Sequence, residues 1–170
     1  MASLMDELLG VLRREKQGYT NLKSLSEEKR VCIIQGDVDK LDSISSKEQD
    51  ETSNLKNLEN KRVKILKDMA VVLGKDGEEI SISDMIEMLE RQPGEQAKLI
   101  QAKDELVAEA SEMQLANQQN EILLRHAMEM VEFDLTLLKS LKQAPETANY
   151  DKNAYNTGEI LGNSGFDTKQ

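Results

Sequence analysis

Residues 95–142 read EQAKLIQAKD ELVAEASEMQ LANQQNEILL RHAMEMVEFD LTLLKSLK, and this stretch decides the fold. Apolar and small side chains recur in it at spacings of three, four or seven residues. Such spacing places them on one side of an α-helix, as in the seam of a coiled coil. The stretch therefore predicts one helix on the order of 70 Å long, and Pro145 is expected to end it. The seam residues are Leu99, Leu106, Ala110, Met113, Asn117, Asn120, Leu124, Ala127, Val131, Leu138 and Leu141.

Two further long helices and one short helix are predicted before this stretch. Apolar residues of the same spacing indicate helices over residues 3–34 and from Asp37 to about Gly74. Between them, Gly36 suits the left-handed conformation that ends a helix, and Asp37 can cap the next one by accepting a backbone N–H. Residues 81–84 read SISD, a capping-box pattern that predicts a short helix over residues 82–90.

These elements predict an all-α protein, namely an antiparallel three-helix coiled-coil bundle with one short capping helix and a flexible C-terminal tail. Short connections send the chain back alongside itself, so consecutive long helices should run in opposite directions. We expect the helical coiled-coil bundle to occupy residues 1–142. The tail, residues 143–170, has turn-forming Asn and Gly but no periodicity.

Several seam positions of these helices carry residues that do not favour tight apolar packing. Glu15, Gly18 and Lys29 occupy seam positions of the first helix, where we expect looser packing. Asn117 and Asn120 lie on the third seam. Buried asparagine commonly fixes the register between coiled-coil helices, and that role is favoured here over ligand binding.

The charge of the chain narrows the classes of partner. Its 170 residues carry a formal net charge of −10, which disfavours binding to nucleic-acid phosphates and to anionic membrane surfaces. No apolar run approaches the roughly 18 residues of a transmembrane helix. The N-terminus lacks the basic region and apolar stretch of a secretory signal, and the single Cys32 cannot form an internal disulfide. We therefore expect a cytoplasmic protein with no membrane insertion and no nucleic-acid partner.

The residues that could carry catalysis or bind a metal stand alone in the sequence. His126 is the only histidine and Cys32 the only cysteine, and no nucleophile turn accompanies either. Asp37, Asp39 and Asp42 lack the Gly and the terminal Glu of a calcium loop. We expect no enzymatic activity, no cofactor, no catalytic residues and no metal site.

The last third of the long helix carries more apolar surface than one seam requires. At about 100° per residue, its apolar side chains cover an arc of roughly 180°, whereas a bundle helix needs a little over 100°. Phe133 lies outside even that arc. This surplus predicts a docking surface for an amphipathic helix of another protein, although the short helix and the tail could instead cover it. The predicted partner-binding residues are Leu123, Met128, Met130, Phe133, Leu135, Leu137, Leu138 and Leu141.

The order and spacing of several motifs resemble the FlgN family of flagellar export chaperones for hook-associated (hook–filament junction) proteins. The first helix breaks at IQGDVDKL (34–41), and the second helix contains LENKR (58–62). An asparagine-bearing stretch, NQQNEILL (117–124), follows the short helix, and the tail opens at Tyr150-Asp151. The similarity covers about residues 4–155.

The resemblance implies a cytosolic type III flagellar export chaperone without ATPase activity. Such a protein would bind the helical termini of hook-associated proteins, prevent their premature self-association and deliver them to the flagellar export apparatus. In that family, substrate binding is associated with the C-terminal part of the chain, where the surplus apolar surface lies.

Two other functions fit the same coiled-coil pattern. A structural coiled coil would satisfy its surplus apolar surface with another copy of itself, forming a weak homo-oligomer. A regulatory coiled-coil adaptor would use the same surface for another helical partner. Sedimentation at increasing concentration separates self-association from binding to a different protein.

Overall fold

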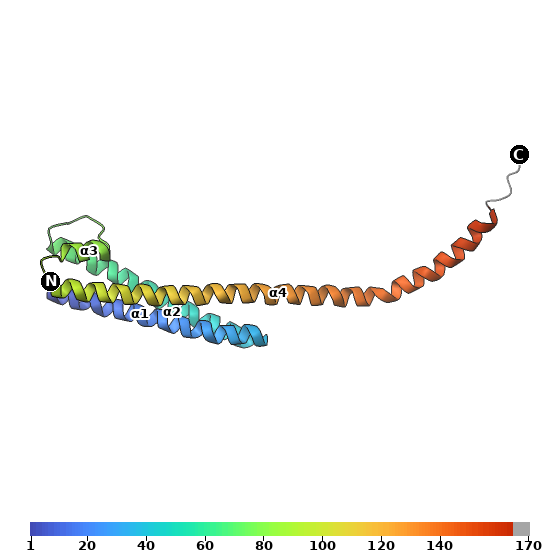
Figure 1. The fold of residues 1–170 in the computed structure, drawn as a ribbon, viewed down its shortest axis with the longest axis horizontal. Helices are drawn as coiled ribbons and strands as arrows, with labels where there is room; N and C mark the ends of the chain where they lie inside the picture. The colour runs from blue at the N-terminus through green and yellow to red at the C-terminus, as the bar shows by residue number, and fades with distance from the viewer. Residues whose placement is uncertain (165–170) are drawn as a thin grey trace, which may run out of the picture. The chain divides into compact units, whose positions relative to one another are not determined.

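The computed structural model describes the backbone of residues 1–164 and the side chains of residues 1–143. Over these residues the chain is all-helical and contains no strand. The helices are α1 (Ala2–Gln35), α2 (Val38–Val72), α3 (Ile82–Met88) and α4 (Pro93–Ser164) (Figure 1). The chain divides into two compact units, which we call the N-terminal unit, Met1–Leu124, and the C-terminal unit, Arg125–Gln170.

The turn between α1 and α2 has the predicted geometry. Gly36 adopts the left-handed conformation with φ 69°, which costs glycine little because it lacks a Cβ. The backbone N–H groups of Gly36 and Asp37 donate to the carbonyl oxygens of Ile33 and Cys32. The Asp37 carboxylate accepts the backbone N–H of Lys40 at 3.1 Å. Both predicted caps are therefore confirmed.

The predicted capping box of α3 is also present. Ser81 Oγ accepts the backbone N–H of Asp84 at 3.1 Å, and the Asp84 carboxylate accepts the backbone N–H of Ser81 at 2.8 Å. Hydrogen bonds from the Ser81 side chain and backbone lower the pKa of Asp84. Met85 and Leu89 are fully buried, so they anchor this short helix to the core.

The main hydrophobic core lies at the end of the N-terminal unit where α3 packs. All four helices contribute to it, and all of its side chains are aliphatic or Met. The core residues are Met5, Leu8, Leu9, Val11 and Leu12 of α1, Ile65, Leu66 and Met69 of α2, Met85 and Leu89 of α3 and its C-cap, and Leu99 and Leu106 of α4.

Helices α1 and α2 run in opposite directions. Glu15 pairs with Arg62 at 3.0 Å, and Lys29 pairs with Glu48 at 2.8 Å. A later residue of α1 thus pairs with an earlier residue of α2, so the two helices are antiparallel, as the short turn at Gly36 requires.

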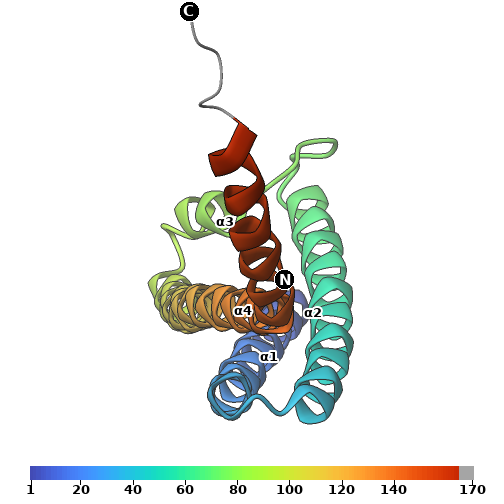
Figure 2. The ribbon, with the colours of Figure 1, turned by 90° about the vertical axis from the view of Figure 1, so that its right-hand side faces the viewer.

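Helices α1 and α4 run in the same direction with a constant register. Four side-chain hydrogen bonds join residues that are all 89 positions apart in the sequence. Gln35, the last residue of α1, therefore lies level with Leu124. Figures 1 and 2 show α1 and α2 beside the first part of α4. The four pairs are Lys16–Glu105 (2.9 Å), Thr20–Glu109 (2.9 Å), Lys23–Glu112 (2.8 Å) and Arg30–Gln119 (2.6 Å).

Gly18 permits a close approach between α1 and α2. It is buried, and a Cβ atom built on it would lie 2.6 Å from Leu55 Cδ2. The looser packing predicted at this position was wrong, because the missing side chain lets Leu55 fill the space.

Gly10 and Gly18 are expected to respond differently to alanine. Both lie inside α1, but a Cβ atom at Gly10 would meet no atom within 4 Å. Gly10→Ala should raise the free energy of unfolding by about 0.5–1 kcal/mol, the gain in helix propensity. Gly18→Ala should lose that gain because Leu55 must move. Urea unfolding followed by circular dichroism measures both, and an equal gain for the two variants would contradict the close approach.

Helix α4 continues beyond its predicted end. We expected it to end near residue 142, with Pro145 as the breaker, but its backbone is helical to Ser164. Proline lacks a backbone N–H, and a helix can continue through it at a cost of about 3 kcal/mol. The predicted boundary after residue 142 and the flexibility of residues 143–170 remain predictions. The side chains of residues 144–170 lie outside the described residues, as does the backbone of residues 165–170.

Candidate partner-binding surface

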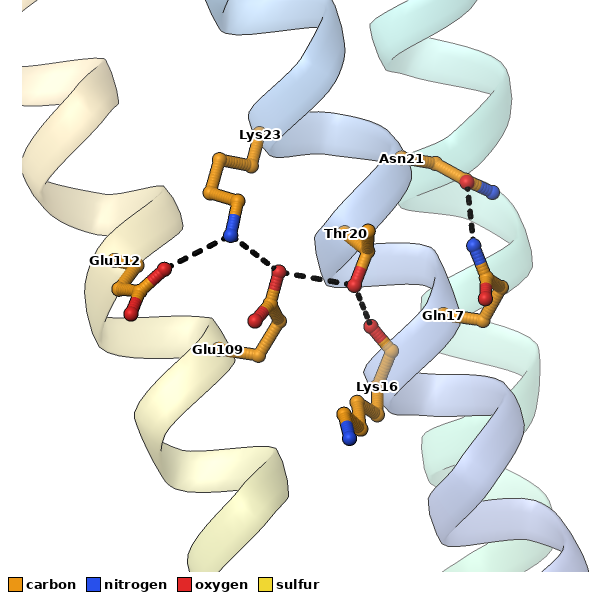
Figure 3. A network of polar contacts seen from close by, with 7 residues as sticks. All are labelled: Lys16, Gln17, Thr20, Asn21, Lys23, Glu109 and Glu112. Atoms are coloured by element: carbon orange, nitrogen blue, oxygen red, sulfur yellow. Dashed lines mark hydrogen bonds and ion pairs between the residues drawn. The ribbon is translucent and has the colours of Figure 1, made fainter.

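A charged network fixes the register of α1 against α4 in the N-terminal unit (Figure 3). Lys23 Nζ lies 2.8 Å from the carboxylates of both Glu109 and Glu112, and Thr20 Oγ donates to Glu109 at 2.9 Å. Hydrogen bonds to these two carboxylates raise the pKa of Lys23. Hydrogen bonds from Lys23 and Thr20 lower the pKa of Glu109. Ion pairs near the surface contribute little stability singly, but together they favour one alignment of the two helices.

The seam of α4 is buried only as far as Asn120. Leu124 is half-buried, and α1 has no residue beyond this level to cover the seam. The predicted seam residues Val131, Leu138 and Leu141 are all exposed. The expectation that α4 buries its whole predicted seam was therefore wrong, and α1 ends level with Leu124.

Seven of the eight predicted partner-binding residues are exposed, and these seven lie in the C-terminal unit. Their exposed fractions run from 49% to 69%, whereas Leu123, in the N-terminal unit, is half-buried. Every side chain of residues 128–143 is exposed, and we call this stretch the distal apolar segment. That α3 or the tail covers these side chains remains a prediction, and the side chains of residues 144–170 lie outside the described residues. The seven are Met128, Met130, Phe133, Leu135, Leu137, Leu138 and Leu141.

The charged residues of the distal apolar segment are ordered along it. Glu129, Glu132 and Asp134 lie in its first half, and Lys139 and Lys142 lie in its second half. A helix docked here would therefore meet acidic groups at one end and basic groups at the other. Such charges orient a partner and steer its approach more than they add affinity.

A buried polar layer interrupts the core of the N-terminal unit. Glu15 is only 3% exposed, and its carboxylate lies 3.0 Å from Arg62 Nη1. Burial raises the pKa of Glu15, although the charge and hydrogen bond of Arg62 oppose that shift. A buried acid of this kind stays ionised only while its cation remains in place.

The two asparagines predicted to set the register both bind Ser26 of α1. Asn120 Nδ2 donates to the Ser26 carbonyl oxygen at 2.6 Å, and Ser26 Oγ donates to Asn117 Oδ1 at 2.6 Å. These contacts agree with a role in aligning α1 and α4. Because Nδ2 must face a carbonyl oxygen, the Asn120 amide has one orientation, which leaves its Oδ1 without a hydrogen-bond partner among the described residues.

A groove of about 600 Å³ lies beside the buried Glu15–Arg62 pair, between α1, α2 and α4 of the N-terminal unit. Glu15, Lys29 and Asn120 line it together with apolar side chains. The looser packing predicted at Glu15 and Lys29 is found here. The sequence signalled it only through the polar seam positions and did not predict a groove. Its mixed lining suits ordered water or a polar group better than an apolar ligand.

The structure assembles no cluster of metal-ligating side chains in the part that it describes. No three His, Cys, Asp or Glu side chains there come together closely enough to hold a metal ion. His126 Nδ1 lies 3.4 Å from a Glu129 carboxylate oxygen, and Cys32 is buried.

None of the helices, over their described residues, combines the length and apolar character needed to cross a membrane.

Comparisons with known proteins place the chain in a family. Searches of the curated proteins and of the solved structures found no match. A family model described as FlgN protein matches residues 1–158. This match spans nearly the whole chain of 170 residues, including the N-terminal unit and most of the C-terminal unit. The resemblance seen in the sequence is thereby confirmed. The chain belongs to the FlgN family, a family of flagellar export chaperones.

Proposed function

We propose that this chain is a cytoplasmic type III export chaperone for hook-associated proteins. It binds them, prevents their premature self-association and delivers them to the flagellar export apparatus. The observation that carries the proposal is the distal apolar segment, whose large apolar side chains are exposed throughout. Family membership supports the chaperone role in general.

The proposed scaffold is an antiparallel three-helix coiled-coil bundle formed by α1, α2 and the first part of α4. The opposed ion pairs of α1 and α2 support it. The shared direction of α1 and α4 supports it too, because an up-down-up path makes the first and third helices parallel.

The proposed mechanism is the covering of an adhesive helix. An unassembled client exposes an amphipathic helix that binds other copies of the client. Laying its apolar face on the distal apolar segment hides that face until export. No ATP hydrolysis by the chaperone is required for such covering.

The amount of apolar surface suits reversible binding. Seven large apolar side chains are about half exposed or more. Burying the exposed part of each contributes on the order of 1 kcal/mol. The lost translational and rotational freedom of the partners offsets several kcal/mol of this. The small balance that remains corresponds to weak, reversible binding, which allows the client to leave at the export apparatus.

The chain is expected to suppress self-association of a purified hook-associated protein at stoichiometric amounts. Light scattering of the client, recorded with and without the chain, measures the effect. The matched control replaces Leu135 and Leu137 with Asp, which should abolish suppression because both side chains lie on the exposed apolar surface. If that double variant still suppresses scattering, the distal apolar segment is not the client site.

Self-association is the second candidate, and the order of charges in the distal apolar segment favours it specifically. An antiparallel second copy would place acidic residues 129–134 opposite basic residues 139–142. Sedimentation of the chain alone at increasing concentration would reveal a stable dimer that Leu135→Asp dissociates.

A further inference from the structure

The apolar side chains of the distal apolar segment form two separate stripes along α4. Each stripe has four members at spacings of three or four residues, the spacing of a helix–helix contact. All eight side chains are 49–69% exposed. Stripe A consists of Met128, Val131, Leu135 and Leu138. Stripe B consists of Met130, Phe133, Leu137 and Leu141.

The two stripes face different directions. At about 100° per residue, their centres lie roughly 135° apart around the helix, and together they span about 220°. One packed helix covers a stripe of a little over 100°. A single client helix therefore hides one stripe and leaves the other in water.

Asp134 lies in the angular gap between the stripes. Its direction is within about 40° of Leu141 on one side and Leu138 on the other, and it is exposed. Two helices seated on the stripes would lie on either side of this carboxylate. The remaining side of the segment carries polar residues, among them Glu129, Glu132 and Thr136.

We propose that the client presents two amphipathic helices to the distal apolar segment, one on each stripe. The charge of Asp134 selects a basic residue on the edge of a client helix that faces the gap between the stripes. This inference rests on the proposed function, and it specifies the partner as a helical pair rather than one helix.

Three successive residues provide a matched test. Leu135 belongs to stripe A, Leu137 belongs to stripe B, and Thr136 lies between them on the polar side. Titration calorimetry of the full chain with a purified hook-associated protein measures Kd. Leu135→Asp and Leu137→Asp should each weaken binding about 30-fold, the loss typical of a buried anchor residue. Thr136→Asp has a similar cost in helix propensity and should leave Kd unchanged.

Two further measurements test the pairing itself. A client fragment that carries one terminal helix should respond to only one of the two leucine substitutions, whereas the intact client should respond to both. Asp134→Lys should weaken binding of the intact client more at low salt than at high salt, because ions screen the repulsion.

The outcomes distinguish this inference from the function on which it rests. If only one leucine substitution weakens binding of the intact client, the two-helix partner is wrong and the client site stands. If neither substitution weakens it, both the inference and the client site fail. If the chain alone forms an oligomer that both substitutions dissociate, a second copy occupies the stripes and the inference is overturned.

Discussion

Leu99→Asp is expected to unfold the N-terminal unit, whereas Leu135→Asp is expected to leave the free energy of unfolding nearly unchanged. Both substitutions place the same charge on the same helix. Leu99 is fully buried in the core that all four helices share. Leu135 is 53% exposed, and substitutions at exposed positions usually change stability by no more than about 0.5 kcal/mol.

The size of the Leu99 effect follows from two costs. Truncating a buried leucine to alanine costs about 2–5 kcal/mol, and burying an unpaired carboxylate costs several kcal/mol more. Their sum is comparable with the whole stability of a small domain, about 5–15 kcal/mol. Far-UV circular dichroism during urea titration measures the loss.

Leu99→Ala serves as a milder control for this comparison, because it removes the side chain without adding charge. It should lower the urea midpoint clearly while the protein still folds. Leu135→Asp should keep the wild-type midpoint and lose capture of a hook-associated protein in a pull-down. A large drop in the midpoint for Leu135→Asp would mean that this side chain is buried and unavailable to a client.

The helices and their ends were predictable because local chemistry sets them. Gly36 at a left-handed position and Asp37 as a cap require no tertiary information. The same is true of the Ser81–Asp84 capping box. The predicted end of α4 near residue 142 was wrong. Pro145 removes one helical hydrogen bond, but it does not prevent the helix from continuing.

The alignment of the helices could not be predicted, and it decides where burial ends. In the sequence, the apolar seam of α4 runs to Leu141. Nothing in the seam itself shows how far along it α1 packs. The offset of 89 residues between α1 and α4 comes from contacts such as Lys16–Glu105. Since α1 ends at Gln35, that offset brings the end of α1 level with Leu124.

The candidate surface was predictable in position but not in form. An apolar surplus after Leu123 is visible in the sequence, and Phe133 stands out among charged neighbours. The sequence predicted one docking surface for one amphipathic helix, with Leu138 and Leu141 counted both as seam and as partner-binding residues. Exposure of Val131 and Leu138 turns the expected seam into a second face. The groove beside Asn120 arises from the paths of three helices and had only polar seam residues as a signal.

Arg62→Met is expected to lower the free energy of unfolding by about 3 kcal/mol at neutral pH, because it leaves the Glu15 carboxylate buried without its cation. Glu15 is 3% exposed and lies 3.0 Å from Arg62. Methionine keeps much of the arginine stem, so the lost charge dominates the effect.

The loss should depend on pH in a definite direction. Burial already raises the pKa of Glu15 in the folded protein above its ordinary value of 4.5. A group with a raised folded-state pKa favours folding most fully below its unfolded pKa, and this contribution is lost as the pH rises through the folded-state pKa. Removing Arg62 removes both influences that lower the pKa of Glu15. Arg62→Met should therefore cost more stability at about pH 8 than at about pH 5.

Urea midpoints of the wild type and of Arg62→Met at those two pH values measure this difference. Arg62 also helps Lys56 to lower the pKa of the exposed Glu59, so a control must isolate Glu15. Glu15→Gln combined with Arg62→Met removes the buried charge and should recover most of the stability lost at the higher pH. If the double variant keeps the pH dependence of Arg62→Met, another group carries it. If Arg62→Met loses the same stability at both pH values, the carboxylate of Glu15 is reached by water and the buried layer does not depend on its ion pair.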